Sequence, residues 1–166
     1  FLRLKQKNCR IALNEIQVDN LLKTDDYSKA IALYQTLFND YLGDRSVAQN
    51  FMKTVSSIYQ RGETAFKNND LVMSGCIHYA LLKNYDLIRR SDLSFPFSNS
   101  SLQDRIKWCS DNLTKKGLEY YRKGNLKEAI PIWKGILTFD PENVEIKKAI
   151  ENSEEQLKKI KKASRK

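Results

Sequence analysis

The sequence is poor in residues that interrupt helices and in residues that carry out catalysis. It contains six glycines, three prolines and one histidine in 166 residues. Because glycine and proline are unfavourable inside helices, their scarcity favours long helices. The cysteines Cys9, Cys76 and Cys109 are far apart and form no C-x-x-C or Cys/His cluster. We therefore predict neither a zinc site nor a redox motif, and expect each cysteine to be a small buried hydrophobic residue.

Signatures of the common catalytic sites are also missing. The sequence has no P-loop, no dinucleotide-binding glycine motif and no nucleophile elbow. A Ser-His-Asp or Cys-His site would need His78, which the helical pattern places on an apolar face as a core residue. Cys76 is two residues away, and this spacing directs the two side chains apart on a helix. We therefore predict a non-enzymatic protein with no cofactor.

Long apolar runs are absent too. No stretch approaches the roughly 18 apolar residues of a membrane span. We therefore expect a soluble domain, and leave open whether it belongs to the cytoplasm or the cell envelope. The chain begins at Phe1 rather than Met. We expect it to be part of a longer protein, in which a targeting segment or lipid anchor could precede it.

Positive charge is plentiful but concentrated at one end. The formal net charge is +9, and six basic residues fall in the last nine positions, which contain no acid. The basic residues of this tail, 158–166, are Lys158, Lys159, Lys161, Lys162, Arg165 and Lys166. Two interpretations stay open. The tail is either a solvated helix end, where cations favour the helix dipole, or a segment that binds RNA or an anionic membrane.

A weak internal repeat appears when the sequence is shifted by 55 residues. In the later copy, apolar and small residues are spaced by three or four, which predicts one stripe along a helix. Glycine inside a helix costs about 1 kcal/mol, so we expect Gly62 and Gly117 to mark close helix–helix contacts. The later stripe consists of Leu102, Ile106, Cys109, Leu113, Gly117 and Tyr120.

The segment KGNLKEAIPIWKGILTFDPEN, residues 123–143, predicts a second helix behind this stripe. Asn125 is the expected N-cap, with Glu128 completing a capping box. Ala129 and Trp133 are one turn apart, so a small residue admits the neighbouring helix beside a large ring. Asp140 and Pro141 are expected to end this helix and to begin the next one as its cap and first residue. Pro131 predicts a kink.

These positions together resemble the tetratricopeptide repeat (TPR) family over residues 110–143. Leu113, Gly117, Tyr120, Ala129, Trp133 and Pro141 have the family's spacing. The pattern departs at Lys116, where the family has Leu. An earlier copy, DDYSKAIALYQTLFNDYL, is weaker, and a middle copy, GETAFKNNDLVMSGCIHYALL, has Ser74 and His78 at the Ala and Trp positions.

The resemblance implies an all-α fold, a right-handed TPR-like superhelical array in one domain over residues 1–166. Its three helical hairpins would span 4–42, 46–89 and 102–141, followed by a capping helix at 142–162. Individual helices are predicted near 4–23, 27–41, 46–68, 71–89, 102–123, 126–138 and 142–162, with each end placed to within about two to four residues and a loop at 90–101. Within this loop, the Phe-Pro-Phe segment at 95–97 either docks a partner or folds back onto the helices.

The resemblance also implies a function, since the first helices of TPR hairpins line a concave face that binds proteins. We therefore expect a protein-interaction module, an adaptor or assembly scaffold, that binds a peptide or helix. The predicted partner-binding residues are Glu15, Asp19, Tyr59, Glu63, Phe66, Tyr121 and Arg122. The Lys/Asn carboxylate clamp of the family's chaperone-binding members is not present. Alternatives are attachment to RNA or an anionic membrane through the basic tail, and a structural or oligomerising segment of a longer protein.

Overall fold

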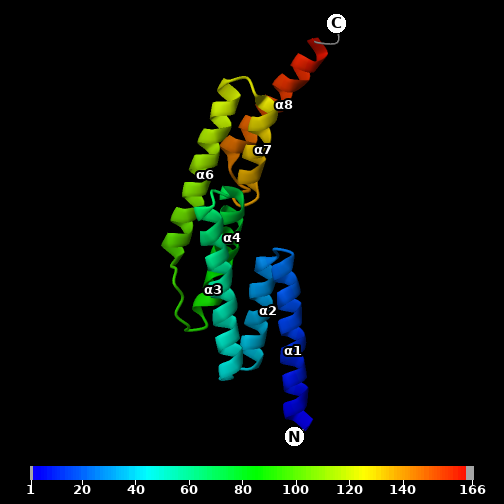
Figure 1. The fold of residues 1–166 in the computed structure, drawn as a ribbon, viewed down its shortest axis with the longest axis vertical. Helices are drawn as coiled ribbons and strands as arrows, with labels where there is room; N and C mark the ends of the chain where they lie inside the picture. The colour runs from blue at the N-terminus through cyan, green and yellow to red at the C-terminus, as the bar shows by residue number, and fades with distance from the viewer. Residues whose placement is uncertain (1, 164–166) are drawn as a thin grey trace. The chain divides into compact units, whose positions relative to one another are not determined.

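The computed structural model describes residues 2–163, which form helices joined by turns and one loop (Figure 1). The all-α prediction is confirmed for these residues. The helices are α1 (Leu2–Lys23), α2 (Tyr27–Asp40), α3 (Arg45–Lys67), α4 (Leu71–Lys83), α5 (Tyr85–Arg89), α6 (Asn99–Arg122), α7 (Leu126–Leu137) and α8 (Val144–Ala163).

Three features of the helices differ from the prediction, each because of a local polar residue. The helix expected at 71–89 is interrupted at Asn84, whose side-chain nitrogen donates to Ala80 O at 2.8 Å. Helix α6 begins at Asn99 rather than 102, because Ser98 Oγ accepts a hydrogen bond from Ser101 N. The loop therefore covers 90–98. Helix α8 is capped by Asn143 and not by Asp140, since Asn143 Oδ1 accepts from Ile146 N at 3.0 Å.

The chain forms two compact units. The N-terminal unit contains residues 1–63 and 77–103, and the C-terminal unit contains 64–76 and 104–166. Helices α3, α4 and α6 each contribute residues to both units. The predicted single domain and its superhelical arrangement stay predictions.

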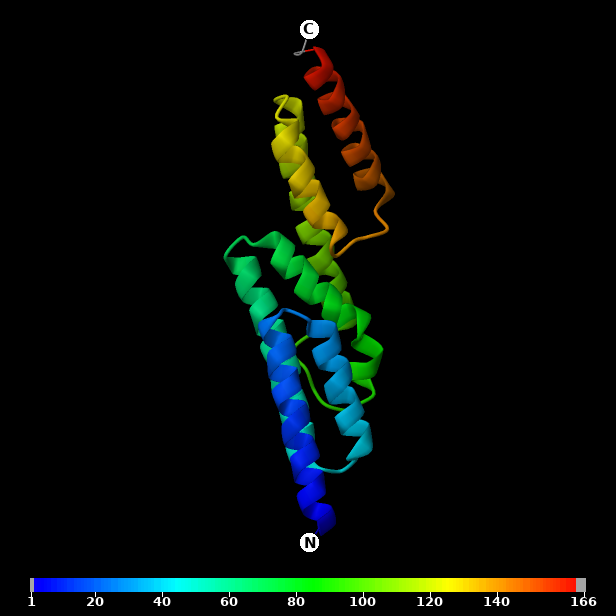
Figure 2. The ribbon, with the colours of Figure 1, turned by 90° about the vertical axis from the view of Figure 1, so that its right-hand side faces the viewer.

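In the N-terminal unit, α1 and α2 pack as an antiparallel hairpin, and α3 runs along α1 (Figures 1 and 2). Asn50 on α3 donates to Glu15 on α1 at 2.5 Å. Arg61 on α3 donates to Leu22 O at 3.2 Å. Between these contacts the helices bury an apolar core that includes Val18, Ile31, Leu37, Phe51, Val55 and Ile58.

In the C-terminal unit, α7 packs against α6 and against α8. The predicted contact at Gly117 is confirmed, because a Cβ there would lie 2.6 Å from Cδ1 of Trp133. Ala129 is fully buried one turn before Trp133. Asn125 is the N-cap residue of α7, but its side chain makes no capping hydrogen bond, so the predicted capping box is wrong. Pro131 lies inside α7 as expected, and the kink stays a prediction.

The cysteine prediction holds for one residue out of three. Cys109 is buried, Cys76 is half-buried and Cys9 is exposed on α1, so the expectation that all three are buried is wrong. Burial raises the pKa of the Cys76 thiol, which lies 3.1 Å from Thr138 Oγ1. The thiol is therefore held in its neutral, unreactive form.

Candidate partner-binding surface

Two of the predicted binding residues lie on α1. Glu15 is half-buried, because its carboxylate accepts the hydrogen bond from Asn50. Asp19 is exposed one turn later on the helix. Glu15 therefore holds α1 against α3, whereas the side chain of Asp19 faces solvent and is accessible to a partner.

Tyr59 and Glu63 belong to a cluster around the single histidine. His78 is 1% exposed, which confirms the prediction of a core histidine, and its Nε2 lies 3.1 Å from Glu63 Oε1. The ring of Tyr59 stands edge-on to His78, with the two centroids 5.7 Å apart. A Cβ at Gly62 would lie 2.7 Å from Cε1 of His78, so the predicted helix contact at this glycine is confirmed.

The Phe-Pro-Phe segment folds back onto the N-terminal unit, as one of the two interpretations predicted. Phe95 lies edge-on to Phe51 of α3, with centroids 6.2 Å apart. The ring centroids of Phe97 and Tyr59 are 5.0 Å apart. Tyr59 is half-buried between Phe97 and His78. Much of its ring is thus used for internal packing, which reduces what it can offer a partner.

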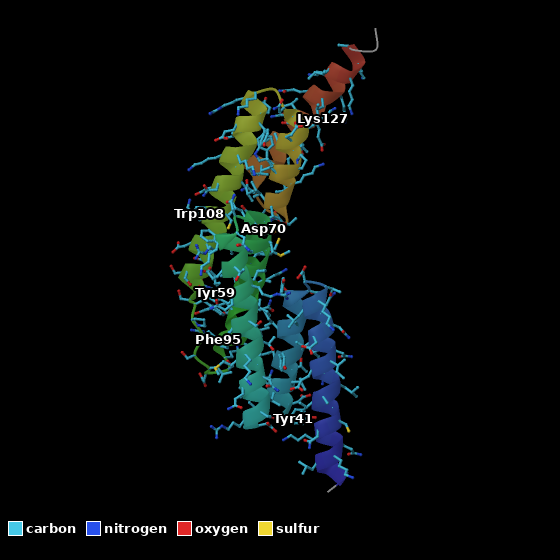
Figure 3. The ribbon with its side chains drawn as sticks, in the orientation of Figure 1. Tyr41, Tyr59, Asp70, Phe95, Trp108 and Lys127 are labelled. Atoms are coloured by element: carbon cyan, nitrogen blue, oxygen red, sulfur yellow. The ribbon has the colours of Figure 1, made fainter. Side chains whose placement is uncertain are left out.

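In the C-terminal unit, Phe66 supports an exposed tryptophan on α6. The rings of Phe66 and Trp108 meet edge-on with centroids 4.7 Å apart. The guanidinium carbon of Arg105 lies 3.7 Å from the centroid of Phe66, a cation–π contact. Trp108 nevertheless remains 45% exposed (Figure 3). Its indole is therefore held in place from one side and open on another.

Trp108 begins a stripe of exposed residues along α6. These residues recur every three or four positions, so they share one face of the helix. We name this face the α6 stripe: Trp108, Asp111, Lys115, Leu118 and Arg122, all exposed. Its two hydrophobic residues, Trp108 and Leu118, are about 15 Å apart along the axis at 1.5 Å per residue. The charged residues between and beyond them keep the stripe soluble.

Tyr121 and Arg122 are neighbours in sequence but point to different surroundings. The Tyr121 ring is half-buried with its centroid 5.9 Å from that of Trp133, and its hydroxyl accepts from Gln156 of α8 at 2.8 Å. Tyr121 thus packs α6, α7 and α8 together. Arg122 is exposed at the last position of α6 and belongs to the stripe.

Trp108 is the residue that the sequence prediction did not name. On this helix the sequence predicted Tyr121 and Arg122 as partner-binding residues, and both lie at its C-terminal end, far from Trp108. A detectable signal existed: Trp108 lies outside the buried stripe of Leu102, Cys109 and Leu113, and Leu118 follows it ten residues later, also outside that stripe. A large aromatic residue on the polar side of an amphipathic helix points to a binding surface.

Across residues 2–163 no group of three or more His, Cys, Asp and Glu side chains is placed to hold a metal ion. None of the described helices is long and apolar enough to cross a membrane. No protein-family model matches the chain, and no significant match to a curated protein or a solved structure was found.

Proposed function

We propose that this chain is a non-enzymatic protein-interaction module of TPR-like helical hairpins, and that the α6 stripe binds a helix or peptide of a partner. The observation that carries this proposal is the exposed Trp108 indole, positioned by Phe66 and Arg105. Aromatic residues that are both exposed and already ordered make efficient binding anchors, because little rotamer entropy is lost on binding.

Two further observations support a helical-hairpin module. The Gly117–Trp133 contact and the buried Ala129 are the packing devices that the TPR resemblance implies for α6 and α7. The polar outer surface of α8 suits a helix that ends an array. The 15 Å between Trp108 and Leu118 suits a partner segment with two apolar anchors about three helical turns apart.

The proposal is tested with peptides selected from a random library by display against the intact chain. We expect Trp108→Ala to weaken the selected peptides by about 2 kcal/mol or more, roughly thirtyfold. Leu118→Ala should weaken them less, because its side chain contributes a smaller area. Leu42→Ala is the matched control, since Leu42 is exposed outside the stripe in the turn between α2 and α3. Peptides that bind Trp108→Ala and wild type equally would contradict the proposal.

A second candidate function rests on the end of α8. Lys158, Lys159, Lys161 and Lys162 are exposed and fall within one side of the helix, whereas Ile160 is exposed on the other side. Arg165 and Lys166 of the predicted tail lie outside the described residues. A helix end with a basic face and an apolar residue suits attachment to an anionic membrane surface.

This second candidate is tested with vesicles of phosphatidylserine and phosphatidylcholine. A variant with all four lysines changed to Gln keeps the helix but removes the charge. We expect wild type to bind anionic vesicles, to release them as salt rises, and to bind neither neutral vesicles nor RNA. The variant should not bind. Equal binding by the variant and wild type would exclude the α8 end, and binding to RNA alone would replace the membrane by a nucleic acid.

A further inference from the structure

One face of α1 carries apolar side chains that the N-terminal unit leaves exposed. Leu13 is 64% exposed and Ile16 is 58% exposed, and Cys9 on the same side is exposed as well. The buried side of α1 is marked by Val18, which faces the opposite direction on the helix. Helices α2 and α3 pack on that buried side, and the side chains of Leu13 and Ile16 stay exposed.

The exposed face has the spacing of a coiled-coil seam. Its residues are separated by three and four positions in alternation, which is the spacing of the a and d positions of a heptad. We name it the α1 seam: Gln6, Cys9, Leu13, Ile16 and Asn20, all exposed. The centre of the seam is apolar and its two ends carry amides. A second helix laid along the seam would remove the side chains of Cys9, Leu13 and Ile16 from water.

The charges beside the seam favour a second α1 helix running in the opposite direction. Lys5 lies seven residues before Ala12, and Asp19 lies seven residues after it. Both are exposed, and both are on the same side of the α1 seam. With a two-fold axis beside Ala12, Lys5 of each copy reaches Asp19 of the other, so two ion pairs form. In a parallel pair the opposite flanks of the two seams meet, so Lys5 would lie beside the exposed Arg10 of the other copy, a pair of like charges. The charge pattern therefore selects the antiparallel arrangement.

We propose that two copies of this chain associate through their α1 seams as an antiparallel pair with its two-fold axis beside Ala12. In this arrangement Ile16 of one copy lies against Cys9 of the other, and Leu13 packs beside the axis. The methyl group of Ala12 lets the backbones approach closely. Gln6 of each copy comes near Asn20 of the other, where the amides can hydrogen-bond and fix the register.

The first experiment measures association of the chain by sedimentation equilibrium. Wild type is expected to be a reversible dimer, and Leu13→Glu should weaken dimerisation at least tenfold, since it places two carboxylates, one from each copy, beside the two-fold axis, where they repel each other. Leu4→Glu is the matched control, because Leu4 is 58% exposed on the same helix but lies away from the seam. A monomer at all concentrations, or a dimer that Leu13→Glu leaves unchanged, overturns the proposal.

The second experiment tests the ion pairs. Lys5→Glu alone turns two attractions into two repulsions and should weaken dimerisation about tenfold. Asp19→Lys alone should have a similar effect. The variant with both changes restores two pairs of opposite charge and should recover wild-type affinity. Additive losses in the double variant would overturn the antiparallel arrangement.

The third experiment tests direction by disulfide cross-linking in a Cys9→Ser background. Ala12→Cys should form a cross-linked dimer on mild oxidation, because residues beside the axis approach to within disulfide distance. Lys5→Cys should not, because the two copies of position 5 lie about 21 Å apart along an antiparallel pair. Cross-linking at Lys5→Cys, or no cross-linking at Ala12→Cys, would overturn the proposal. Circular dichroism checks that every variant keeps its helices.

Discussion

At the scale of single residues, the two tryptophans of the chain have opposite surroundings. Trp133 is 2% exposed and lies against the α6 backbone at Gly117. Its Nε1 is buried without a hydrogen-bond partner among the described residues. The close packing that Gly117 permits therefore leaves the indole nitrogen without a hydrogen-bond acceptor. Trp108 has a solvent-facing ring instead, with Phe66 behind it.

This difference predicts unequal effects on stability. Trp133→Ala should lower the free energy of unfolding by about 3–5 kcal/mol, because it leaves a cavity between α6 and α7. Trp108→Ala should change it by less than about 1 kcal/mol, since almost half of the residue is already exposed to solvent. Urea denaturation followed by circular dichroism measures both. A loss of less than about 1 kcal/mol for Trp133→Ala would contradict the packing described for α6 and α7.

The sequence predicted Trp133 but not Trp108, for a physical reason. Trp133 lies one turn after Ala129, in a window of apolar residues that only a buried helix face explains. Trp108 lies among charged residues, where periodicity shows that the position faces outward but not what orders the ring. Its support comes from Phe66, 42 residues earlier, and such long-range contacts leave no local signal.

At the scale of elements, the start of α3 depends on Asp44. Its carboxylate accepts hydrogen bonds from Ser46 N at 2.9 Å and Val47 N at 3.3 Å, and pairs with Lys7 of α1. The ion pair with Lys7, followed by the hydrogen bonds from Ser46 and Val47, holds the pKa of Asp44 well below its usual value. One side chain thus caps α3 and joins it to α1.

The lowered pKa predicts an acid-sensitive contribution to stability. Because the folded state favours the ionised carboxylate, the contribution is complete above the unfolded pKa of about 4 and is lost as the pH falls toward the folded pKa. Asp44→Asn should therefore destabilise the protein at pH 7. It should also make the free energy of unfolding depend less on pH between about pH 4 and 2. Asp25→Asn, also at a helix boundary, is the comparison. The prediction is tested by measuring denaturation midpoints across this pH range. Midpoints that fall equally steeply with pH in wild type and Asp44→Asn would contradict it.

The loop at 90–98 behaves as part of the core of its unit. Phe95 and Phe97 stack with centroids 5.7 Å apart, and they pack on Phe51 and Tyr59 of α3. We expect Phe95→Ala combined with Phe97→Ala to destabilise the protein by about 2–4 kcal/mol. Pro96→Ala, an exposed position between them, should have little effect. Chemical denaturation of the three proteins tests this, and an unaffected double variant would show a loosely attached loop.

Helix existence was easier to predict from the sequence than helix boundaries. Apolar periodicity gave the positions of α1, α2, α3, α6 and α7 within a few residues. The break at Asn84 and the cap at Asn143 were missed, because each depends on one side-chain amide that competes for a backbone group. Such a competition is decided by geometry, and a polar residue inside a helical pattern does not reveal it.

At the scale of the whole molecule, the two units differ in charge. The C-terminal unit has 17 Lys and Arg residues against 11 Asp and Glu residues, a formal charge of +6, which leaves +3 for the N-terminal unit. Two thirds of the net charge therefore belongs to the unit that contains α7, α8 and most of α6. Anionic partners should accordingly be attracted to this unit first.

Continuity of three helices predicts how the units unfold. Because α3, α4 and α6 each contribute residues to both units, loss of one unit removes flanking turns from helices of the other. We expect a single transition in urea. Tryptophan fluorescence reports only the C-terminal unit, which contains both tryptophans, whereas far-ultraviolet circular dichroism reports both units. Separate midpoints for the two signals would contradict a cooperative transition.

The buried imidazole of His78 gives the N-terminal unit a reporter of its own. It is the single histidine of the chain, it is 1% exposed, and its Nε2 faces Glu63. An acylating reagent such as diethyl pyrocarbonate can reach it only when α3 and α4 separate around Gly62. The rate of carbethoxylation at this one ring then measures how often the unit opens under native conditions, without any label or substitution.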